Sequence, residues 1–586
     1  MHRRAGPVLL MFVLLALLVI PMAIGDAFVY HIFITICMFA GLATAWNIVG
    51  GYAGQLSLGH AVFYGIGAYV GMLLVSAGIT PWIGMFAGAG IAALVAVAIS
   101  YPCFRLHGPF FALASIAFLE VFRVLALHFG DITGGATGMM VPLETGWQWM
   151  IFRDRLPSLV IAFGLMLTTL AVAWGLRRHR FGFYLVATRE RESAARSAGI
   201  GTVRMRLLAV AVSAALTAMI GTFHAMYLTF IEPSSVFSLT FSIQIAMFAL
   251  IGGIGTIFGP LVGTILLVPL TELARGWLGA EALGLHGFVY GTVLVLAVLF
   301  MPDGIMSALG KLVRKRATAP GASEGAPRTA ESVERPAIGG AVLKAENLDK
   351  HFGGLHVTNN VSFTLREGEV LGVIGPNGAG KTTVFNMLSG FLKPDSGRVL
   401  LRDADGEFRS PTSPGDFARL QLGRTFQIVQ PFAAMTVEEN IMVGAFHRHP
   451  RVADARRAAR EMAERMGLSR HLDDEARGLP VGALKRLEIA RVMAMEPRVL
   501  LLDEAMAGIN RADLRQAIEL IREIRDTGVS IIAIEHVMQA IMSLSDRVIV
   551  INSGEVIAEG EPDAVVRDEA VIEAYLGKES VDAEAA

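Results

Sequence analysis

A glycine-rich run ending in lysine and threonine occupies residues 375–383. It reads Gly-Pro-Asn-Gly-Ala-Gly-Lys-Thr-Thr, between an apolar stretch at 370–374 and a helix-like stretch at 384–388. A strand, a glycine-rich loop and a helix in this order form a phosphate-binding loop, whose backbone N–H groups and helix N-terminus face phosphate oxygens. A glycine turn before an ordinary helix would not need lysine and threonine at its end. The segment therefore predicts that the chain binds ATP or GTP.

Two side chains of this loop are predicted to have different ligands, one the phosphates and the other the metal ion. The Lys381 ammonium can reach the β- and γ-phosphates, and the Thr382 hydroxyl can ligate Mg²⁺. We expect ATP and Mg²⁺ as cofactors. The predicted nucleotide-binding residues are Gly375, Pro376, Asn377, Gly378, Ala379, Gly380, Lys381, Thr382 and Thr383.

Two carboxylates follow a second apolar run, at residues 499–502. Asp503 and Glu504 would stand at the end of a buried strand. Asp503 can hold Mg²⁺ through water, and Glu504 can polarise the attacking water as a general base. A buried strand with an acidic end is common by itself, but after a phosphate-binding loop it predicts an ATP hydrolase.

Composition divides the 586 residues into two parts. Hydrophobic residues make up 54% of the chain and charged residues 17%, with the charge concentrated after about residue 313. The net charge of −1 gives no indication of nucleic acid as a partner, and Cys37 and Cys103 predict no disulfide framework. We expect a multidomain protein: an all-α polytopic membrane domain at 1–316, a flexible linker rich in Ala, Pro, Gly and Ser at 317–341, and an α/β P-loop ATPase domain at 342–586.

About ten membrane helices are predicted, because apolar runs approach or exceed the roughly 20 residues that cross a bilayer. The runs fall near 7–24, 28–49, 60–78, 81–103, 109–128, 157–176, 207–229, 240–257, 258–274 and 285–302. Arginines and lysines near residues 2–4, 177–206 and 311–316 place those segments in the cytoplasm. The number of spans must then be even, with a break near Gly252. The first run could instead be a cleaved signal peptide, although its length favours a retained helix.

Polar residues within the apolar runs have two interpretations. Asn47, Gln55 and Ser57 surround a glycine-rich stretch at 50–54, where irregular backbone would either line a translocation path or serve helix packing. Glu120 and Arg123 are three residues apart, so we expect them to pair on one helix. The long outward loop from Phe129 to Leu156 is either a docking or gating loop or a plain connector.

Several segments of the membrane half resemble the permeases of ABC importers. Residues 189–200 are similar to the coupling loop of these permeases, a Glu-Ala-Ala helix followed by glycine that sits in a groove on the ATPase. Residues 46–60, residues 63–69 and the Thr133-Gly134-Gly135 loop resemble the permeases for branched-chain amino acids. The separate stretches agree in order over most of this half.

The second half resembles an ABC nucleotide-binding domain. The resemblance implies that Gln427 senses Mg²⁺ and contacts the permease, that His536 contacts the γ-phosphate, and that Phe352 stacks on adenine. The catalytic residues would then be Glu504, His536 and Gln427, and the metal-binding residues Thr382, Gln427 and Asp503. The chain end at 574–577 is similar to ATPases of the branched-chain amino-acid group.

Two loops depart from the family pattern. The signature loop, usually Leu-Ser-Gly-Gly-Gln, reads Leu-Pro-Val-Gly-Ala at 479–483, and the loop at 507–510 ends in asparagine where aspartate is commoner. In ABC dimers each ATP lies between one phosphate-binding loop and the partner's signature loop. The missing serine and glutamine therefore predict a heteromeric transporter with one strong and one weak ATP site, although similar families accept proline at the serine position.

The resemblance implies a fused permease and ATPase subunit that imports branched-chain or related small amino acids. Its partners would be a second permease, a second ABC ATPase and a periplasmic solute-binding protein, with the helices in the lipid of the bacterial inner membrane and the ATPase in the cytoplasm. An ABC exporter would have about six spans and long cytoplasmic helices, and a membrane-anchored regulatory ATPase would hydrolyse ATP without moving solute. The sequence does not name the solute, since amides, urea and aromatic acids use similar permeases.

Overall fold

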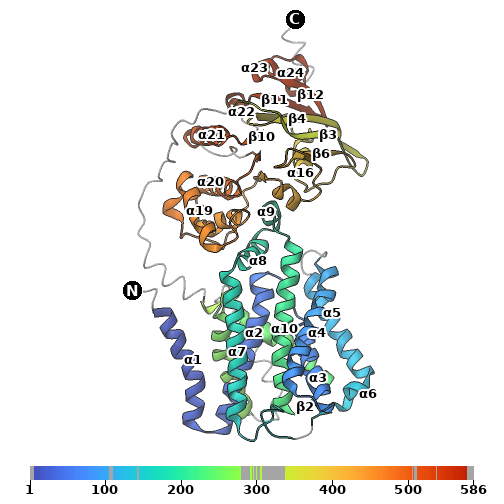
Figure 1. Cartoon of the computed structure of the whole chain (residues 1–586), viewed down its shortest axis with the longest axis vertical. Coiled ribbons are helices and arrows are strands. Elements are labelled where there is room, and N and C mark those ends of the chain that lie inside the picture. The colour runs from blue at the N-terminus through green and yellow to red at the C-terminus, as the bar shows by residue number, and fades with distance from the viewer. Residues whose placement is uncertain are drawn as a thin grey trace. The chain divides into compact units, whose positions relative to one another are not determined.

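The computed structural model describes residues 5–104, 110–141, 144–278, 337–504, 511–535 and 538–576, together with 291–292, 295, 299, 304–306 and 506. These residues fall into two compact units (Figure 1). The membrane unit takes its residues from 1–185 and 203–321, and the ATPase unit from 186–202 and 322–586. The membrane-half segment 186–202 thus belongs to the ATPase unit. Residues 317–336 of the predicted linker lie outside the described residues.

Helices make up the membrane unit, and nine of the ten predicted spans are helical. Six stretches in the described part of the chain are long and apolar enough to cross a membrane, so this is a membrane protein. The tenth predicted span, 285–302, lies mostly outside the described residues. The nine helices are α1 (Ala5–Ile24), α2 (Ala27–Asn47), α3 (His60–Ser76), α4 (Pro81–Cys103), α5 (Phe110–His128), α7 (Arg155–Arg178), α10 (Thr202–Leu228), α12 (Leu239–Gly253) and α13 (Gly259–Leu278).

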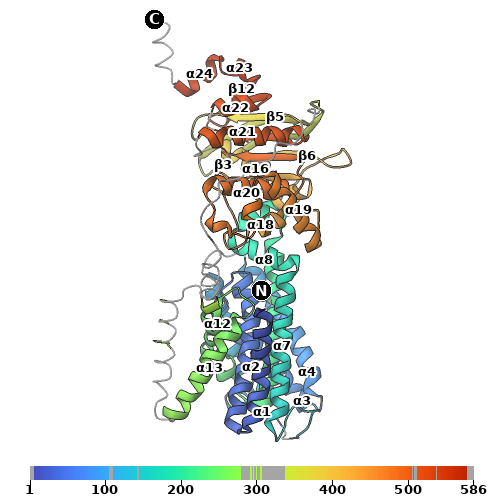
Figure 2. The ribbon, with the colours of Figure 1, turned by 90° about the vertical axis from the view of Figure 1, so that its left-hand side faces the viewer.

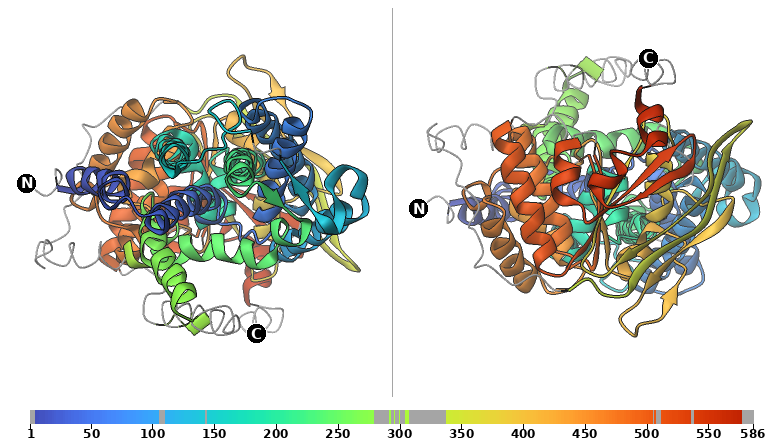
Figure 3. Two further views of the ribbon diagram at one scale, coloured as in Figure 1. Left: turned by 90° about the horizontal axis from the view of Figure 1, so that it is seen from below. Right: turned by 90° about the horizontal axis from the view of Figure 1, so that it is seen from above.

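Close packing of these helices depends on small residues at the crossings. Helix α2 packs against α1, α7, α12 and α13, and α3 packs against α4 (Figures 2 and 3). A Cβ on Gly67 of α3 would overlap the backbone carbonyl of Ala218 in α10, so only glycine permits this approach. The predicted break at Gly252 is confirmed: α12 ends at Gly253 and α13 begins at Gly259, where a Cβ on Gly252 would overlap the Gly259 carbonyl.

Irregular backbone follows α2, as predicted for the glycine-rich stretch. A π-helical turn spans Ile48–Tyr52, and the chain reaches α3 without further regular structure. The Asn47 side chain donates to the Thr256 carbonyl and accepts from the Gly255 N–H, both at 2.8 Å. Asn47 therefore joins the end of α2 to the α12–α13 break, which supports the packing interpretation for this residue.

The long loop between α5 and α7 is bonded to the rest of the membrane unit at several places, among them the hydrogen bonds that Thr80 Oγ1 and Trp82 Nε1 donate to the carbonyls of Gln148 and Trp147. Strand β1 (Met139–Met140) pairs antiparallel with β2 (Phe230–Ile231), the segment that follows α10. The short helix α6 (Gly130–Thr133) precedes it, and α11 (Pro233–Val236) follows β2. On α5, the predicted pair is confirmed, since Arg123 and Glu120 lie 2.5 Å apart on the exposed face.

A six-stranded sheet forms the centre of the ATPase unit, with strand order β12–β11–β5–β10–β9–β8. The strands are parallel except β12, which pairs antiparallel with β11. Because parallel strands end at one edge, the residues after β5, β8, β9 and β10 gather there. The strands are β5 (Val370–Ile374), β8 (Leu422–Arg424), β9 (Val499–Asp503), β10 (Ser530–Ile534), β11 (Arg547–Asn552) and β12 (Glu555–Gly560).

A second, antiparallel sheet has the order β4–β3–β6–β7, and its apolar face joins the same core as β5 and β9. Its strands are β3 (Ala341–Phe352), β4 (Leu355–Arg366), β6 (Ser396–Arg402) and β7 (Phe408–Arg409). The helices of this unit include α9 (Glu192–Ser197), α16 (Lys381–Leu388), α17 (Pro414–Arg419), α18 (Val437–Ala445), α20 (Val481–Met493), α21 (Arg511–Asp526), α22 (Met538–Leu544) and α24 (Glu569–Leu576), and α8 (Arg180–Glu190) precedes α9 in the chain. The structure confirms the predicted fold class, a helical membrane region followed by an α/β ATPase domain.

Candidate functional site: an ATP site and the helix docked beside it

The glycine-rich loop connects β5 to α16, as the sequence predicts. Gly375, Gly378 and Gly380 have φ angles of +152°, +83° and +95°, which residues with a side chain rarely adopt. A Cβ on Gly375 would overlap the Ile551 carbonyl, and one on Gly380 would lie 2.6 Å from the Val357 carbonyl. Glycine is therefore required both for the turn of the loop and for its close contact with β4 and β11.

The lysine of the loop is folded against its backbone. Lys381 Nζ donates to the carbonyls of Gly375 and Pro376 at 2.8 and 2.9 Å. Burial lowers the pKa of this ammonium, and the charge of Glu504 opposes that shift. A buried cation within reach of the Glu504 charge, at the N-terminus of α16, makes the loop suited to phosphate. Thr382 is exposed next to it.

Glu504 and Gln427 come together although they are far apart in sequence. Gln427 Nε2 donates to Glu504 Oε2 at 3.1 Å. Glu504 has a φ of +47°, a conformation that costs a non-glycine residue energy, and its N–H donates to the Ile534 carbonyl at 2.9 Å. The strained backbone directs the chain away from β9, and the carboxylate lies at the same sheet edge as the phosphate-binding loop.

Asp503 has a buried ionic partner that sequence reasoning missed. Arg424, at the end of β8, donates to Asp503 Oδ2 at 3.1 Å, and both side chains are 4% exposed. The same guanidinium donates to Asn386 Oδ1 at 2.8 Å and Ser389 Oγ at 2.6 Å. Burial lowers the pKa of Arg424 and the Asp503 charge opposes this. Arg424 thus ties three elements of the site together, and an arginine three residues before Gln427 was the available signal.

Glu535 is a second missed residue. It follows β10, is buried, and accepts a hydrogen bond from the Met506 N–H at 2.8 Å. Burial, reinforced by the charges of Glu504 and Asp503, raises the pKa of this carboxyl to about 7. Its position directly before His536 was the available signal. His536 itself and the loop at 507–510 lie outside the described residues.

The altered signature loop leads into α20 without a side-chain cap. Pro480 is the N-cap residue and makes no side-chain hydrogen bond to the helix, whereas serine at this position could cap it. Its carbonyl accepts from the Leu484 N–H at 3.0 Å, so the helix starts normally. Pro480 and Val481 are exposed and Ala483 is buried. The loop therefore presents backbone and an apolar side chain to solvent.

Phe352 stands at the tip of the β3–β4 hairpin. Its ring is 50% exposed, and Lys350 Nζ lies 5.8 Å from the ring centroid. Val357, five residues on in β4, contacts Gly380 of the phosphate-binding loop through its carbonyl. The hairpin tip is therefore close to the nucleotide loop, although no described contact joins the Phe352 ring to it.

The segment with the permease coupling pattern forms a short helix within the ATPase unit. Helix α9 packs against α17 and ends before Gly199, whose φ of +79° confirms the predicted glycine stop. Ser193 Oγ bonds Gln430 Oε1, and Glu190 Oε2 accepts from the Ala434 N–H at 3.1 Å. Arg196 stands 5.7 Å from the centre of the Phe391 ring. Helix α9 is thus docked by polar and cation–π contacts, not by apolar packing alone.

Gln430 connects this helix to α20, which follows the signature loop. Its backbone N–H donates to Glu488 Oε1 at 3.3 Å, and its carbonyl accepts from Arg491 Nη1 at 2.9 Å. Glu488 and Arg491 are themselves buried and 3.5 Å apart. Burial raises the pKa of Glu488 to about 7, while Arg491 opposes the shift. A continuous set of hydrogen bonds therefore runs from Ser193 through Gln430 to α20, with Gln427 three residues away.

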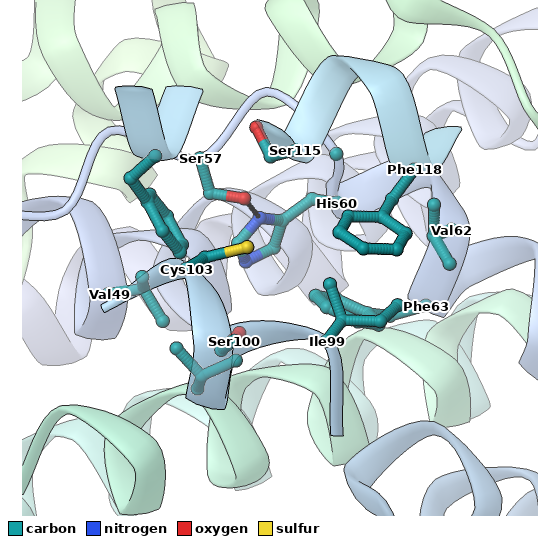
Figure 4. Close-up of a pocket in the computed structure, with 13 residues that line it drawn as sticks. Val49, Ser57, His60, Val62, Phe63, Ile99, Ser100, Cys103, Ser115 and Phe118 are labelled. Carbon is teal, nitrogen blue, oxygen red and sulfur yellow. Dashed lines mark hydrogen bonds between the residues drawn. The ribbon is translucent and has the colours of Figure 1, made fainter. Parts of the chain in front are cut away.

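Figure 4 shows a small cavity in the membrane unit beside His60 and Ser57. The His60 ring nitrogens lie 2.8 Å from Ser57 Oγ and 2.9 Å from Ser213 Oγ, and Ser213 donates to the Ala45 carbonyl at 2.6 Å. The cavity has a volume of about 20 Å³. That is room for about one water molecule, so this cavity cannot hold an amino acid. The buried polar chain instead links α2, α3 and α10.

A larger cavity of about 910 Å³ lies where α2 and α7 begin and α10 ends. Its polar wall contains His31, Asp154, Arg155 and Tyr227. The Tyr227 hydroxyl lies 2.9 Å from both Arg155 Nη1 and His31 Nδ1. The volume is sufficient for a small organic solute, and the wall offers charges of both signs.

Comparison with known proteins agrees with both halves. Residues 28–298 match the family described as the permease component of the branched-chain amino acid transport system, residues 358–507 match the ABC transporter family, and residues 555–581 match the branched-chain amino acid ATP-binding cassette transporter family.

Individual relatives match the second half of the chain. The high-affinity branched-chain amino acid transport ATP-binding protein LivG of Escherichia coli is 42% identical over 254 residues, which are 40% of this chain and 98% of that protein. The corresponding protein BraF of Pseudomonas aeruginosa is 39% identical over the same length. A crystal structure of an ATP-binding cassette of an ABC transporter in its ADP conformation is 30% identical, with a TM-score of 0.37, and covers 41% of this chain and 99% of that one. On the sequence matches to its two halves, the chain belongs to the branched-chain amino acid family of ABC transporters, and it joins a permease domain and a nucleotide-binding ATPase domain in one polypeptide.

Proposed function

We propose that the chain is the fused permease and ATPase subunit of an importer for branched-chain or related small amino acids in the bacterial inner membrane. The permease would comprise residues 1–316, the linker 317–341 and the ATPase domain 342–586. The observation that carries the proposal is the docked helix α9. A segment of the membrane half bonds to Gln430 of the ATPase, three residues from Gln427 and its contact with Glu504. An ATPase that moved no solute would not need this connection.

The residues at the sheet edge fit ATP and Mg²⁺. The loop at 375–383 holds the phosphates, with Lys381 neutralising their charge and Phe352 stacking on adenine. Mg²⁺, when bound, neutralises phosphate charge and is held by Thr382, Gln427 and, through water, Asp503. Glu504 accepts a proton from the attacking water, and His536 contacts the γ-phosphate. The exposed Thr382 hydroxyl and the Arg424 contact that orients Asp503 support these assignments.

Coupling follows from the bonds around Gln430. Any shift of Gln427 on ATP binding moves the short segment that carries Gln430, and Gln430 holds Ser193 of α9. The cytoplasmic ends of α7 and α10 flank this helix in sequence, so the movement reaches the permease. On the outer side, the cavity lined by Asp154 and Arg155 admits the solute, because a zwitterionic amino acid offers an ammonium and a carboxylate to these two side chains.

The complete transporter contains a second permease, a second ABC ATPase and a periplasmic solute-binding protein. The exposed Pro480 and Val481 at the start of α20 support a heteromeric assembly, because neither side chain can donate a hydrogen bond to a γ-phosphate. A lost donor toward developing charge costs about 2.7–4 kcal/mol. A single-chain preparation should therefore hydrolyse ATP slowly, and an ATPase with an intact signature loop should raise turnover. Full solute-stimulated turnover by the chain alone would contradict the asymmetry.

The experiment that tests the function measures uptake of labelled leucine into proteoliposomes that contain the assembled transporter. The solute-binding protein is added outside the vesicles, and ATP is enclosed inside them, on the side of the ATPase domain. Glu504→Gln should retain ATP binding and lose about 10²–10⁴-fold of turnover and uptake together, because the general base is removed. ATP-driven movement in the opposite direction would identify an exporter. ATP hydrolysis without movement of leucine, isoleucine, valine or any related amino acid would identify a regulatory ATPase.

A further inference from the structure

Two histidines face each other at the tip of the β3–β4 hairpin. His351 and His356 are direct partners across the antiparallel strands, joined by a turn that contains Gly353 and Gly354. Their rings stack at 9° with centroids 4.0 Å apart. Neither residue belongs to the motifs that bind nucleotide. A pair of imidazoles held on adjacent strands presents two nitrogen ligands at a spacing fixed by the sheet.

Asp349 completes a three-residue cluster on the same face of the hairpin. Its Oδ1 lies 3.1 Å from His351 Nδ1, and its Oδ2 lies 2.9 Å from His356 Nε2. One ligand atom from each residue lies within 4.8 Å of the other two. The Asp349 side chain is 19% exposed and the imidazoles 50% and 38%. The cluster is therefore open to ions from solvent and has a carboxylate at its base.

The ligand types select the class of ion. Imidazole nitrogen with one carboxylate suits Zn²⁺, Co²⁺ and Ni²⁺, whereas Mg²⁺ prefers oxygen ligands and water. Three protein ligands with solvent access leave a position for water. The cluster thus differs in chemistry from the Mg²⁺ ligands proposed beside the phosphate-binding loop, which are a hydroxyl, an amide and a carboxylate.

Asp395 supports the cluster from outside. Its Oδ2 accepts from the His351 backbone N–H at 2.8 Å, and its Oδ1 accepts from Lys350 Nζ at 2.6 Å. Oδ2 also lies 3.9 Å from His351 Nδ1. These bonds anchor the strand that carries His351, as hydrogen bonds outside the ligands orient them in metal sites.

The cluster is next to the nucleotide loop. Val357 follows His356 and its carbonyl abuts Gly380, while the Asn359 N–H donates to the Gly554 carbonyl at 2.8 Å. Phe352 follows His351 directly. An ion that ties His351 to His356 would therefore fix both the strand that contacts the phosphate-binding loop and the residue that carries the exposed ring.

We propose that Asp349, His351 and His356 bind a divalent transition-metal ion of the Zn²⁺ class, at a site separate from the Mg²⁺–nucleotide site. Because imidazole lone pairs lie in the ring plane, the two stacked rings turn out of their parallel arrangement when the ion binds. One nitrogen from each imidazole and a carboxylate oxygen of Asp349 then coordinate the ion, and water completes the coordination. By bridging the two strands at their turn, it holds the hairpin tip in place against the phosphate-binding loop.

The test uses Co²⁺ as a spectroscopic probe on the full chain, purified without a histidine tag and kept nucleotide-free in excess Mg²⁺. We expect saturable visible absorption from one Co²⁺ per chain, abolished by Zn²⁺. His351→Ala and His356→Ala should each weaken Co²⁺ binding at least about tenfold. His471→Ala is the matched control, since His471 Nδ1 lies 2.8 Å from a single carboxylate, that of Asp474. Absence of saturable absorption, or equal weakening in the control, would overturn the site.

A second measurement needs no variant and so does not depend on how variants fold. Histidine acylation of the intact chain is followed by mass spectrometry with and without Zn²⁺. Zn²⁺ should protect His351 and His356 and leave His471 and His449 reactive. Equal modification of all four in both conditions would refute the proposal.

Discussion

The bond between Ser193 of α9 and Gln430 of the ATPase offers a direct test of coupling. Gln430→Ala removes this side-chain bond, while its backbone bonds to Glu488 and Arg491 remain. One half-buried neutral hydrogen bond contributes about 0.5–1.5 kcal/mol, or roughly a 2- to 13-fold change in docking of the helix. The contacts of Gln427 with Glu504 are untouched, so basal ATP hydrolysis should stay close to that of the parent.

The expected result is therefore a loss of solute-stimulated over basal ATPase activity, with a matching loss of uptake. Ser193→Ala removes the same bond from the other side. In a double-mutant cycle the two changes should not add, and the coupling energy should be about 1 kcal/mol, because the second change removes a bond already lost.

A control variant distinguishes loss of this bond from loss of the helix. Ser197→Ala is a suitable control, because Ser197 Oγ donates to the Ala194 carbonyl within α9 and makes no described side-chain hydrogen bond to residues 342–576. Additive effects of Ser193→Ala and Gln430→Ala on stimulated turnover would refute the coupling role of the bond. So would an equal loss in Ser197→Ala, since it would show that α9 had merely lost helical structure.

Three further predictions follow from the buried and charged groups. Arg424→Ala should lower the free energy of unfolding of the ATPase domain by about 3–5 kcal/mol, because Asp503 keeps a buried charge without its cation. Thermal unfolding measures this loss. Arg424→Ala combined with Asp503→Asn should recover part of the lost stability, because the buried charge is then removed. The raised pKa of Glu535 means that its contribution to stability is present below about pH 4.3, the unfolded pKa of glutamate, and is lost as pH rises through about 7. Glu535→Gln should therefore remove on the order of 3 kcal/mol of this decline, measured by denaturant unfolding from pH 5 to 8, whereas an unchanged slope would place the proton elsewhere. Arg155→Ala should reduce leucine uptake severalfold and leave basal ATP hydrolysis unchanged; equal uptake by variant and parent would exclude the cavity beside Tyr227 from the solute path.

Local patterns in the chain determined the fold class and the nucleotide loop. Residues 375–383 are contiguous, so their glycines, lysine and threonines predict a phosphate-binding loop from the neighbouring strand and helix alone. Likewise the apolar runs predicted nine helices that the structure contains and the break at Gly252, because a span needs length and composition but no partner. The glycine stop after α9 was predictable for the same local reason.

Tertiary structure alone decided which distant groups meet. Gln427 bonds Glu504, 77 positions further along the chain, and Arg424 pairs with Asp503, 79 positions further along. Both contacts form because strands β8 and β9 lie side by side in the sheet. Burial depends on the whole fold, so the raised pKa of Glu535 could not be predicted from its neighbours in sequence. The same holds for the partners of Ser193, since one serine on a short helix carries no information about which loop it contacts. The cluster of Asp349, His351 and His356 was partly predictable, because its residues are close in sequence. Only the register of β3 against β4 brings the two imidazoles face to face.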